Sequence, residues 1–208
     1  AQYPTVPKHI PAGRIFILGG GHVGANAAKM ASRMGSEVFV SEVSREKRER
    51  LDKEFKLAEL KINLIGPEDK AQYEALLASS EVIVASVHAP GKRAPIVIDL
   101  PLLQKISAPK RKVILDIAID QGGNVAEAHP VNYDSPLYLD SFGNLRFSVA
   151  NIPSLCGRGA SLALEAVSLG YTAALAGGLE QALKQYPELE SGINILNGAV
   201  IHPALCDG

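Results

Sequence analysis

The sequence predicts an α/β protein with a doubly wound parallel sheet of the Rossmann type, followed by a helical C-terminal appendage. Two observations predict this fold class. Short apolar runs alternate with helix-forming stretches over residues 14–150, and a glycine-rich turn joins the first run to the first helix. Strands that are apolar throughout and separated by helices indicate a parallel sheet covered on both faces. Six such strands fit the order 3-2-1-4-5-6.

Six apolar runs are the expected strands, and the stretches between them are the expected helices. The strands are expected at residues 14–18, 38–42, 59–65, 81–87, 112–118 and 145–150. The helices are expected at residues 22–34, 44–55, 67–78 and 100–106. Ser44 is expected to cap the second helix, and the run Pro67-Glu68-Asp69 is expected to open the third.

The glycine-rich turn at residues 19–24 lies between the first strand and the first helix, and Glu42 ends the following strand. This arrangement is typical of dinucleotide-binding domains. Gly19 permits the tight turn, Gly21 lets the backbone approach a pyrophosphate, and Gly24 lets the helix pack closely on the strand. The helix N-terminus then offers N–H groups and a positive dipole end to the phosphates. The alternative is that the glycines serve only strand–helix packing.

Glu42 bears on the choice between the two nicotinamide dinucleotides. Its carboxylate can accept hydrogen bonds from the hydroxyls of the adenosine ribose, and its charge repels a 2′-phosphate, which favours NAD over NADP. The basic cluster of Arg45, Lys47, Arg48 and Arg50 weakens this inference, because an arginine at this place can receive a 2′-phosphate.

Composition excludes several other classes of function. The chain has 208 residues, of which 47% are hydrophobic and 21% charged, and a formal net charge of −1, which gives no support for binding to nucleic acid or a membrane surface. Cys156 and Cys206 are too few for a disulfide framework and lack the spacing of metal ligands, so a reducing cytosol and no metal are expected. Residues 1–4 show neither the basic start nor the apolar core of a signal peptide.

The chain changes character after the run Asn151-Ile152-Pro153. Residues 1–152 are expected to form the dinucleotide-binding domain, and residues 153–208 a helical segment with helices at 160–175 and 179–185. The first of these helices is dominated by Ala and Leu, so burial on most sides is expected. Its sixteen residues are expected to be too few to cross a bilayer. The helical segment is therefore expected to pack on a segment missing from this chain or on a partner subunit.

Several segments match one known family in order and spacing across nearly the whole chain. They are Gly19-Gly20-Gly21-His22-Val23-Gly24-Ala25-Asn26-Ala27-Ala28-Lys29-Met30-Ala31, Pro90-Gly91-Lys92-Arg93-Ala94-Pro95, Asp116-Ile117-Ala118-Ile119-Asp120-Gln121-Gly122-Gly123, Val149-Ala150-Asn151-Ile152-Pro153, Gly192-Ile193-Asn194 and Asn197-Gly198. These segments resemble alanine dehydrogenases. The related proton-translocating transhydrogenases share the fold, but they usually lack the aspartate that stands here at Asp120. The resemblance implies NAD as cofactor, a small amino or keto acid as substrate, and a homo-oligomer.

The resemblance also implies roles for particular residues. The acid that matches Glu42 holds the adenosine ribose, and Asp120 matches an aspartate near the reacting carbon, which makes it the implied catalytic residue. The residues implied to contact the cofactor are Gly19, Gly21, His22, Val23, Gly24, Glu42, Lys47, Val87, His88, Ala89, Asp120, Asn151 and Ile152. Asp120 follows a strand at its carboxyl end, where open α/β sheets bind their ligands, so its location supports the same role independently.

Two other polar residues near these strand ends have open interpretations. His88 can hydrogen-bond a ribose or can be a solvated loop residue. Asp116 lies within an expected strand, so a buried carboxylate with hydrogen bonds from the backbone is expected there, with a structural rather than a chemical role.

Hydride transfer is one of three requirements of the alanine dehydrogenase reaction. Oxidative deamination also needs a cation that holds the carboxylate and a base that activates water. In alanine dehydrogenases an N-terminal substrate domain supplies both, so this chain by itself is expected to bind the cofactor and to turn over alanine poorly or not at all.

Two departures from the family pattern keep other functions open. The run Gly157-Arg158-Gly159-Ala160-Ser161 stands where alanine dehydrogenases usually carry Pro-Arg-Thr-Ser-Thr, and His88 replaces a large aliphatic residue. The alternatives are a transhydrogenase subunit, a dehydrogenase for another amino or opine acid, and a non-catalytic module that senses NAD(H).

Overall fold

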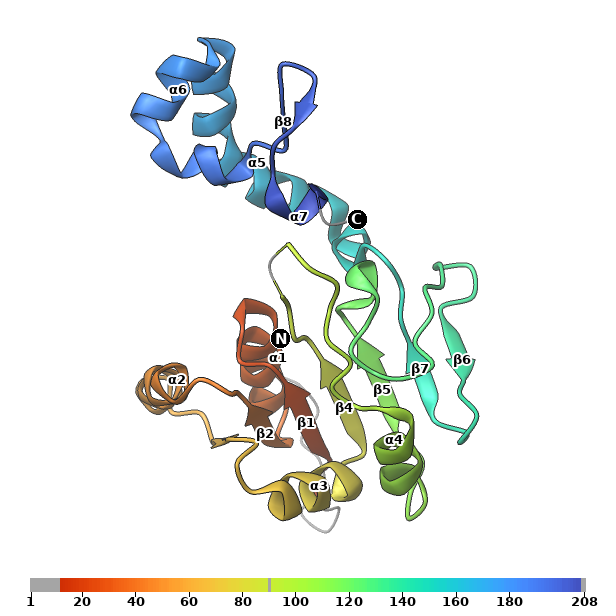
Figure 1. The fold of residues 1–208 in the computed structure, drawn as a ribbon. Coiled ribbons are helices and arrows are strands. Elements are labelled where there is room, and N and C mark those ends of the chain that lie inside the picture. Colours follow the sequence, from red (N-terminus) through yellow and green to blue (C-terminus); the bar gives the residue numbers. More distant parts are fainter. Residues whose placement is uncertain (1–11, 90, 207–208) are drawn as a thin grey trace. The chain divides into compact units, whose positions relative to one another are not determined.

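A seven-stranded sheet and a helical segment belong to two separate units of the chain, residues 1–150 and 151–208 (Figure 1). The computed structural model describes residues 12–89 and 91–206. Pro90 of the family-like run at 90–95 and the N-terminal residues 1–4 lie outside the described residues.

The sheet of the first unit has the predicted strand order with one strand added. Its parallel strands are β1 (Arg14–Leu18), β2 (Glu37–Ser41), β3 (Ile62–Ile65), β4 (Val82–Ala85), β5 (Val113–Asp116) and β7 (Leu145–Phe147). These six strands stand in the order β3-β2-β1-β4-β5-β7, so their predicted order is confirmed. The added strand, β6 (Leu137–Leu139), pairs antiparallel with β7 at the sheet edge.

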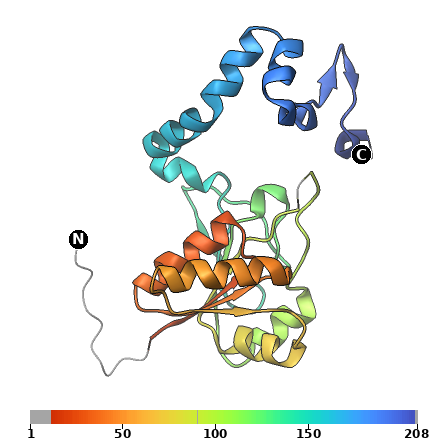
Figure 2. The same ribbon diagram turned by 90° about the vertical axis from the view of Figure 1, so that its left-hand side faces the viewer.

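Helices cover both faces of this sheet, as expected for buried parallel strands (Figure 2). On one face α1 (His22–Arg33) and α2 (Arg45–Leu57) pack over Ile17 of β1, and on the other α3 (Lys70–Ser79) and α4 (Leu100–Ser107) pack over its neighbours Phe16 and Leu18. Consecutive strand side chains point to opposite faces. Each apolar strand therefore contributes to two cores.

Side chains at the helix starts decide where α2 and α3 begin. The Ser44 hydroxyl accepts a hydrogen bond from the Lys47 N–H at 3.2 Å, as predicted for an N-cap. The predicted start of α3 at Pro67 is wrong, because the Asp69 carboxylate caps the helix by accepting from the Gln72 N–H at 2.9 Å. The first residues of the expected third strand are also outside β3, which begins at Ile62.

The second unit consists of short elements around one long helix. It contains η2 (Ile152–Cys156), α5 (Gly157–Ala176), α6 (Leu179–Gln185), η3 (Pro187–Gly192), the paired strands β8 (Ile195–Leu196) and β9 (Ala199–Val200), and α7 (Pro203–Cys206). No residue of α5 is buried within this chain, so the expected burial against a missing segment or a partner subunit stays a prediction.

α5 is longer than predicted, because it spans 20 residues rather than sixteen. The helical stretch Ile152–Ala176 has 25 residues and a hydropathy of 1.2 over its most apolar window, so by length and composition alone it can cross a membrane. Core helices of soluble proteins meet the same criterion. The expectation that this segment does not span a membrane therefore stays a prediction.

Truncation of Phe55 measures how much the core under α2 contributes to the free energy of unfolding. Phe55 is 2% exposed and packs against α1 and β2, so Phe55→Ala is expected to lower the free energy of unfolding by about 3–5 kcal/mol. Urea denaturation followed by circular dichroism measures it, since the chain has no Trp. Leu57 ends the same helix and is 87% exposed, so Leu57→Ala is the matched control, with a loss below about 0.5 kcal/mol. Equal losses would contradict the packing described.

Candidate functional site

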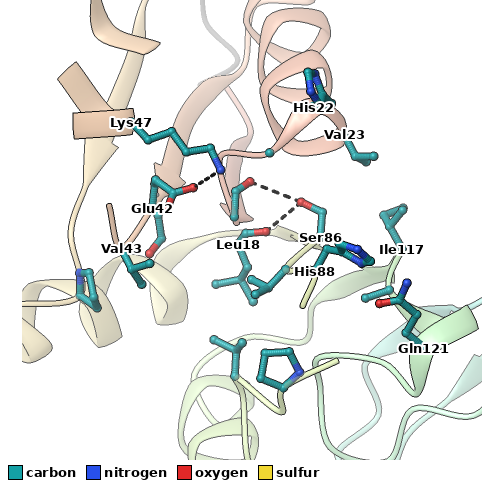
Figure 3. A pocket seen from close by; sticks show the side chains of 18 of the residues that line it. Leu18, His22, Val23, Glu42, Val43, Lys47, Ser86, His88, Ile117 and Gln121 are labelled. Carbon is teal, nitrogen blue, oxygen red and sulfur yellow. Dashed lines mark hydrogen bonds and ion pairs between the residues drawn. The ribbon is translucent and has the colours of Figure 1, made fainter. Parts of the chain in front are cut away.

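A cavity of about 800 Å³ opens at the carboxyl ends of β1, β2, β4 and β5 (Figure 3). The chain leaves β1 on one side toward β2 and returns on the other side at β4, so the cavity lies where the strand order reverses. Ligands of open α/β sheets bind at such a place, and the volume is typical of small-molecule sites. The residues that line it are Leu18, Gly19, Gly21, His22, Val23, Ser41, Glu42, Val43, Lys47, Pro67, Tyr73, Ser86, Val87, His88, Pro95, Val97, Ile117, Ala118, Asp120 and Gln121.

The glycine turn combines tight packing on its inner side with open space on its outer side. A Cβ atom on Gly24 would lie 1.9 Å from the Gly19 carbonyl oxygen and 2.9 Å from the Ser86 hydroxyl, so only glycine permits α1 to sit this close to β1 and β4. Gly19 has a φ of +90°, which favours glycine. A Cβ on Gly21 would meet nothing within 4 Å. The turn therefore has the open surface that a phosphate group needs.

The N-terminus of α1 faces this open space. Gly21 is the N-cap residue, no side chain caps the helix, and the first turn contains no acidic residue. The first helical N–H groups have no carbonyl partner within the helix and carry the positive end of the dipole. His22 and Val23 begin the helix and line the cavity, so an anionic group bound there would meet unpaired donors.

Glu42 is held at the opposite wall of the cavity by three donors. One carboxylate oxygen accepts from the Gly20 N–H at 3.1 Å and pairs with the Lys47 ammonium at 2.9 Å, and the other accepts from the Ser44 N–H at 3.0 Å. Figure 3 shows the Lys47 side chain reaching across to this carboxylate. Glu42 is 7% exposed. The bond from Gly20 links the acid directly to the glycine turn.

The charged form of Glu42 is favoured in the folded protein. Burial alone raises the pKa of this carboxyl, but the Ser44 N–H, the Lys47 ammonium and the Gly20 N–H together hold its pKa below the ordinary value of 4.5. Glu42 therefore stays ionised at neutral pH, as one member of an ion pair with Lys47.

The loops after β4 and β5 form the other end of the cavity. Val87 and His88 follow β4, while Asp120 and Gln121 belong to the short helical turn η1 (Ile119–Gln121) that follows β5. The Ala94 N–H donates to the Gln121 carbonyl at 2.9 Å and joins the two loops. His88 is exposed, and its ring is drawn beside Ile117 and Gln121 (Figure 3).

Asp116 lies beneath these loops and is fully buried, in agreement with the structural role expected for it. One of its oxygens accepts from the Asn124 N–H at 2.8 Å and from the Val125 N–H at 3.1 Å. Burial raises the pKa of this carboxyl, although the backbone donors and the charge of Arg146 act in the opposite direction. Asp116 is not among the residues that line the cavity, and the oxygen with hydrogen-bond partners holds the backbone of the segment after η1.

The cavity brings together most residues that the sequence singled out. Those that line it are Gly19, Gly21, His22, Val23, Glu42, Lys47, Val87, His88 and Asp120. Gly24 lies behind the turn, Ala89 is not among the lining residues, and Asn151 and Ile152 belong to the second unit, so their role stays a prediction. In the part of the chain that the structure describes, no group of three His, Cys, Asp or Glu residues can hold a metal ion.

Sequence reasoning missed several lining residues. Ser86, Ile117 and Ala118 follow strand ends, and that location was a usable signal. Tyr73 reaches the cavity from α3, its ring meets Phe16 edge to face at 5.4 Å, and burial raises the pKa of its hydroxyl to about 12. No motif marks it in the sequence.

Acid titration tests the Glu42 ion pair. A carboxyl whose pKa is lowered on folding stabilises the protein above its unfolded pKa, near 4.5, and this stabilisation is lost as the pH falls through the folded pKa. Glu42→Gln is expected to lose about 1–3 kcal/mol of unfolding free energy at pH 7 and progressively less below pH 4.5. Urea denaturation across this pH range measures it. Glu49→Gln, on the exposed face of α2, is the control, and a pH-independent difference at Glu42 would contradict the charge argument.

Comparison with known proteins identifies one family. The family model described as "Alanine dehydrogenase/PNT, C-terminal domain" matches residues 3–203. The alanine dehydrogenase of Bacillus subtilis (strain 168) is 31% identical over 198 residues, which cover 94% of this chain and 50% of that protein. The alanine dehydrogenase of Methanococcus maripaludis is 34% identical over 204 residues, which cover 96% of this chain and 52% of that protein.

Solved structures agree with this assignment. An L-alanine dehydrogenase with 32% identity superposes with a TM-score of 0.79 over 94% of this chain and 52% of its own. The transhydrogenase from Sinorhizobium meliloti, at 22% identity, shares the fold with a TM-score of 0.65 over 94% of this chain and 51% of its own. The chain spans about half the length of the curated relatives it matches. It belongs to the alanine dehydrogenase/PNT family and corresponds to that family's C-terminal, NAD-binding domain.

Proposed function

We propose that the cavity of the first unit binds NAD(H) and that this chain is the cofactor-binding part of an enzyme that interconverts L-alanine with pyruvate and ammonia. The observation that carries the proposal is the pairing of an open glycine turn at the N-terminus of α1 with the buried Glu42 carboxylate, joined by the hydrogen bond from Gly20. The turn suits a pyrophosphate and the carboxylate suits a ribose, and both face one cavity.

The residues of the cavity support one orientation of the cofactor. The pyrophosphate would lie against Gly19 and Gly21, the adenosine ribose against Glu42, and the nicotinamide end near His88 and Asp120. The nicotinamide supplies hydride transfer when the cofactor is bound. Asp120 then acts at the reacting end, where its carboxylate can orient the substrate or hold a proton.

The charges around Glu42 support NAD rather than NADP. Lys47 is already paired with Glu42. Arg48 donates to the Glu42 carbonyl at 2.5 Å and pairs with Glu68 at 2.6 Å, and Arg45 pairs with Glu49 on the outer face of α2. These three cations of the basic cluster are therefore engaged. A 2′-phosphate would meet the Glu42 charge without an unpaired cation among them.

Ribose binding requires a rearrangement at Lys47. A carboxylate offers about four acceptor positions, and Gly20, Ser44 and Lys47 already use three on Glu42. Two ribose hydroxyls would therefore share or displace the Lys47 ammonium.

The remaining catalytic groups have to come from outside this chain. Lys47 is the one Lys or Arg among the described residues that line the cavity, and it pairs with Glu42. We therefore propose that the half of the relatives not matched here supplies the cation for the substrate carboxylate. The apolar side chains exposed on α5 would pack on that half or on another copy of the chain, and they are Leu162, Leu164, Val167, Leu169 and Leu175. A homo-oligomer is proposed on the same grounds, and a cytosolic location on the small number of cysteines.

The same shortage of cations favours a second candidate function. A module that binds NAD(H) without turnover, and senses its redox state, needs the glycine turn and Glu42 but no cation for a substrate. The run from Gly157 to Ser161, which departs from the family pattern, is compatible with such a module.

Cofactor titration tests the proposed site. The 208-residue chain is expected to bind NADH with a Kd in the micromolar range, and NADPH about tenfold or more weakly, because the Glu42 charge opposes a 2′-phosphate. Cofactor fluorescence measures both. Glu42→Ala should reduce the preference, while Glu49→Gln should leave it unchanged. Equal affinity for the two cofactors, or binding of neither, would contradict the assignment.

Substitution of Asp120 separates the two candidate functions. In a protein that also contains the half found in the relatives, Asp120→Asn is expected to lower turnover by about 10²-fold or more, a much larger effect than its effect on NADH affinity. Steady-state amination of pyruvate measures turnover, and fluorescence measures affinity. Unchanged turnover would remove the catalytic role of Asp120, and no turnover in the unaltered protein would favour the sensing module.

A further inference from the structure

A single buried amide bonds to Val87 and Pro95, the residues on either side of the loop at 88–94, of which the structure describes all but Pro90. Asn124 is fully buried and lies in the segment after η1. Its side-chain oxygen accepts from the Val87 N–H at 2.8 Å, and its side-chain nitrogen donates to the carbonyl oxygens of Val87 at 3.0 Å and Pro95 at 2.9 Å. Val87 directly precedes the loop and Pro95 directly follows it.

The backbone of Asn124 extends the same connection. Its carbonyl accepts from the N–H groups of Val97 at 2.7 Å and Ile98 at 3.1 Å, and the Ala126 N–H donates to the Ile98 carbonyl at 2.8 Å. Val87, Pro95 and Val97 all line the cavity, whereas Asn124 is not among the lining residues. Asn124 therefore holds one wall of the cavity from behind.

Asn124 is itself fixed from below. The buried Asp116 carboxylate accepts from its N–H at 2.8 Å. Gly123, with a φ of +80°, brings this backbone so close that a Cβ there would lie 2.8 Å from the Asp116 carboxylate. Asp116 ends β5, so Asn124 anchors the 88–94 loop to the sheet.

Both backbone groups of Val87 depend on this amide. Asn124 satisfies the N–H and the C=O of Val87 together, in the way that a neighbouring strand would. Polar backbone groups that are removed from water without a partner are costly, so loss of the amide would make Val87 and Pro95 move toward water or toward another partner. His88 follows Val87 directly and would move with it.

We propose that Asn124 is a positioning residue for the cofactor site. It holds Val87 and Pro95 together at the base of the 88–94 loop. It thereby sets the positions of Val87 and His88 at the nicotinamide end of the cavity. This inference rests on the proposed function, because its consequence is measured as NADH affinity. Asn124 does not line the cavity, yet its hydrogen bonds hold the residues of one cavity wall in place.

Asn144 provides a matched control within the same unit. It is also a fully buried asparagine, it accepts from the Lys112 N–H at 2.9 Å and it donates to the Ser107 hydroxyl at 2.8 Å. Lys112 precedes β5 at its amino end. Asn144 therefore binds the backbone at the amino ends of the strands, opposite to the cavity at their carboxyl ends. Asn124→Ala and Asn144→Ala therefore remove the same buried amide at the two ends of one strand.

The test compares these variants of the 208-residue chain by three measurements: NADH affinity by fluorescence, thermal midpoint, and hydrogen exchange at the Val87 amide. Asn124→Ala is expected to weaken NADH binding about tenfold or more and to speed exchange at Val87. Asn144→Ala is expected to lower the thermal midpoint similarly while NADH affinity stays within about twofold. Asn124→Ser, which keeps one hydroxyl, serves the same comparison if the alanine variant does not fold.

The outcomes separate this inference from the proposed function. Provided that the unaltered chain binds NADH, any of three results would overturn the positioning role. They are unchanged NADH affinity in the Asn124 variants, equal losses of affinity in the Asn124 and Asn144 variants, and unaltered exchange at Val87. If the unaltered chain binds no NADH, the proposed function fails and the inference fails with it.

Discussion

The close approach of three backbone segments at the glycine turn is the constraint on which the rest of the site depends. The Gly24 position leaves no room for a side chain beside the Gly19 carbonyl, and the Ser86 hydroxyl bonds to the Leu18 carbonyl at 2.8 Å. This contact sets how near α1 comes to β1 and β4. It thereby fixes the direction of the helix N-terminus and brings Gly20 within hydrogen-bond distance of Glu42. Phosphate-binding and ribose-binding features are thus parts of one packed unit.

Glu42 and Asp116 are two buried acids at the carboxyl ends of parallel strands, and their surroundings give them different roles. Glu42 is surrounded by donors that outweigh its burial, so it stays charged at the cavity wall. Asp116 is more strongly affected by burial, and both donors that bind it belong to the loop above. One carboxylate is available to a ligand, whereas the other organises the backbone on which the ligand would rest.

The features predicted correctly from the sequence are those with a local or periodic signal. Apolar runs separated by helices fixed the order of six strands, and the glycine turn followed by Glu42 located the cavity. β6 was missed because three residues are too few to show a period. Tyr73 and Asn124 were missed because their roles arise from contacts that only the fold creates, such as the bond from Val87 to Asn124 across 37 positions. The length of α5 was underestimated because its glycines suggested a loop.

The short strands at both ends of the sheet restrict how this domain can associate with other chains. β3 has four residues and β6 has three, so each edge offers few backbone groups to an incoming strand. Brief edges of this kind discourage strand addition and the aggregation that follows from it. These short edges therefore favour assembly through side-chain surfaces, where shape and chemistry select the partner, over pairing of exposed backbone.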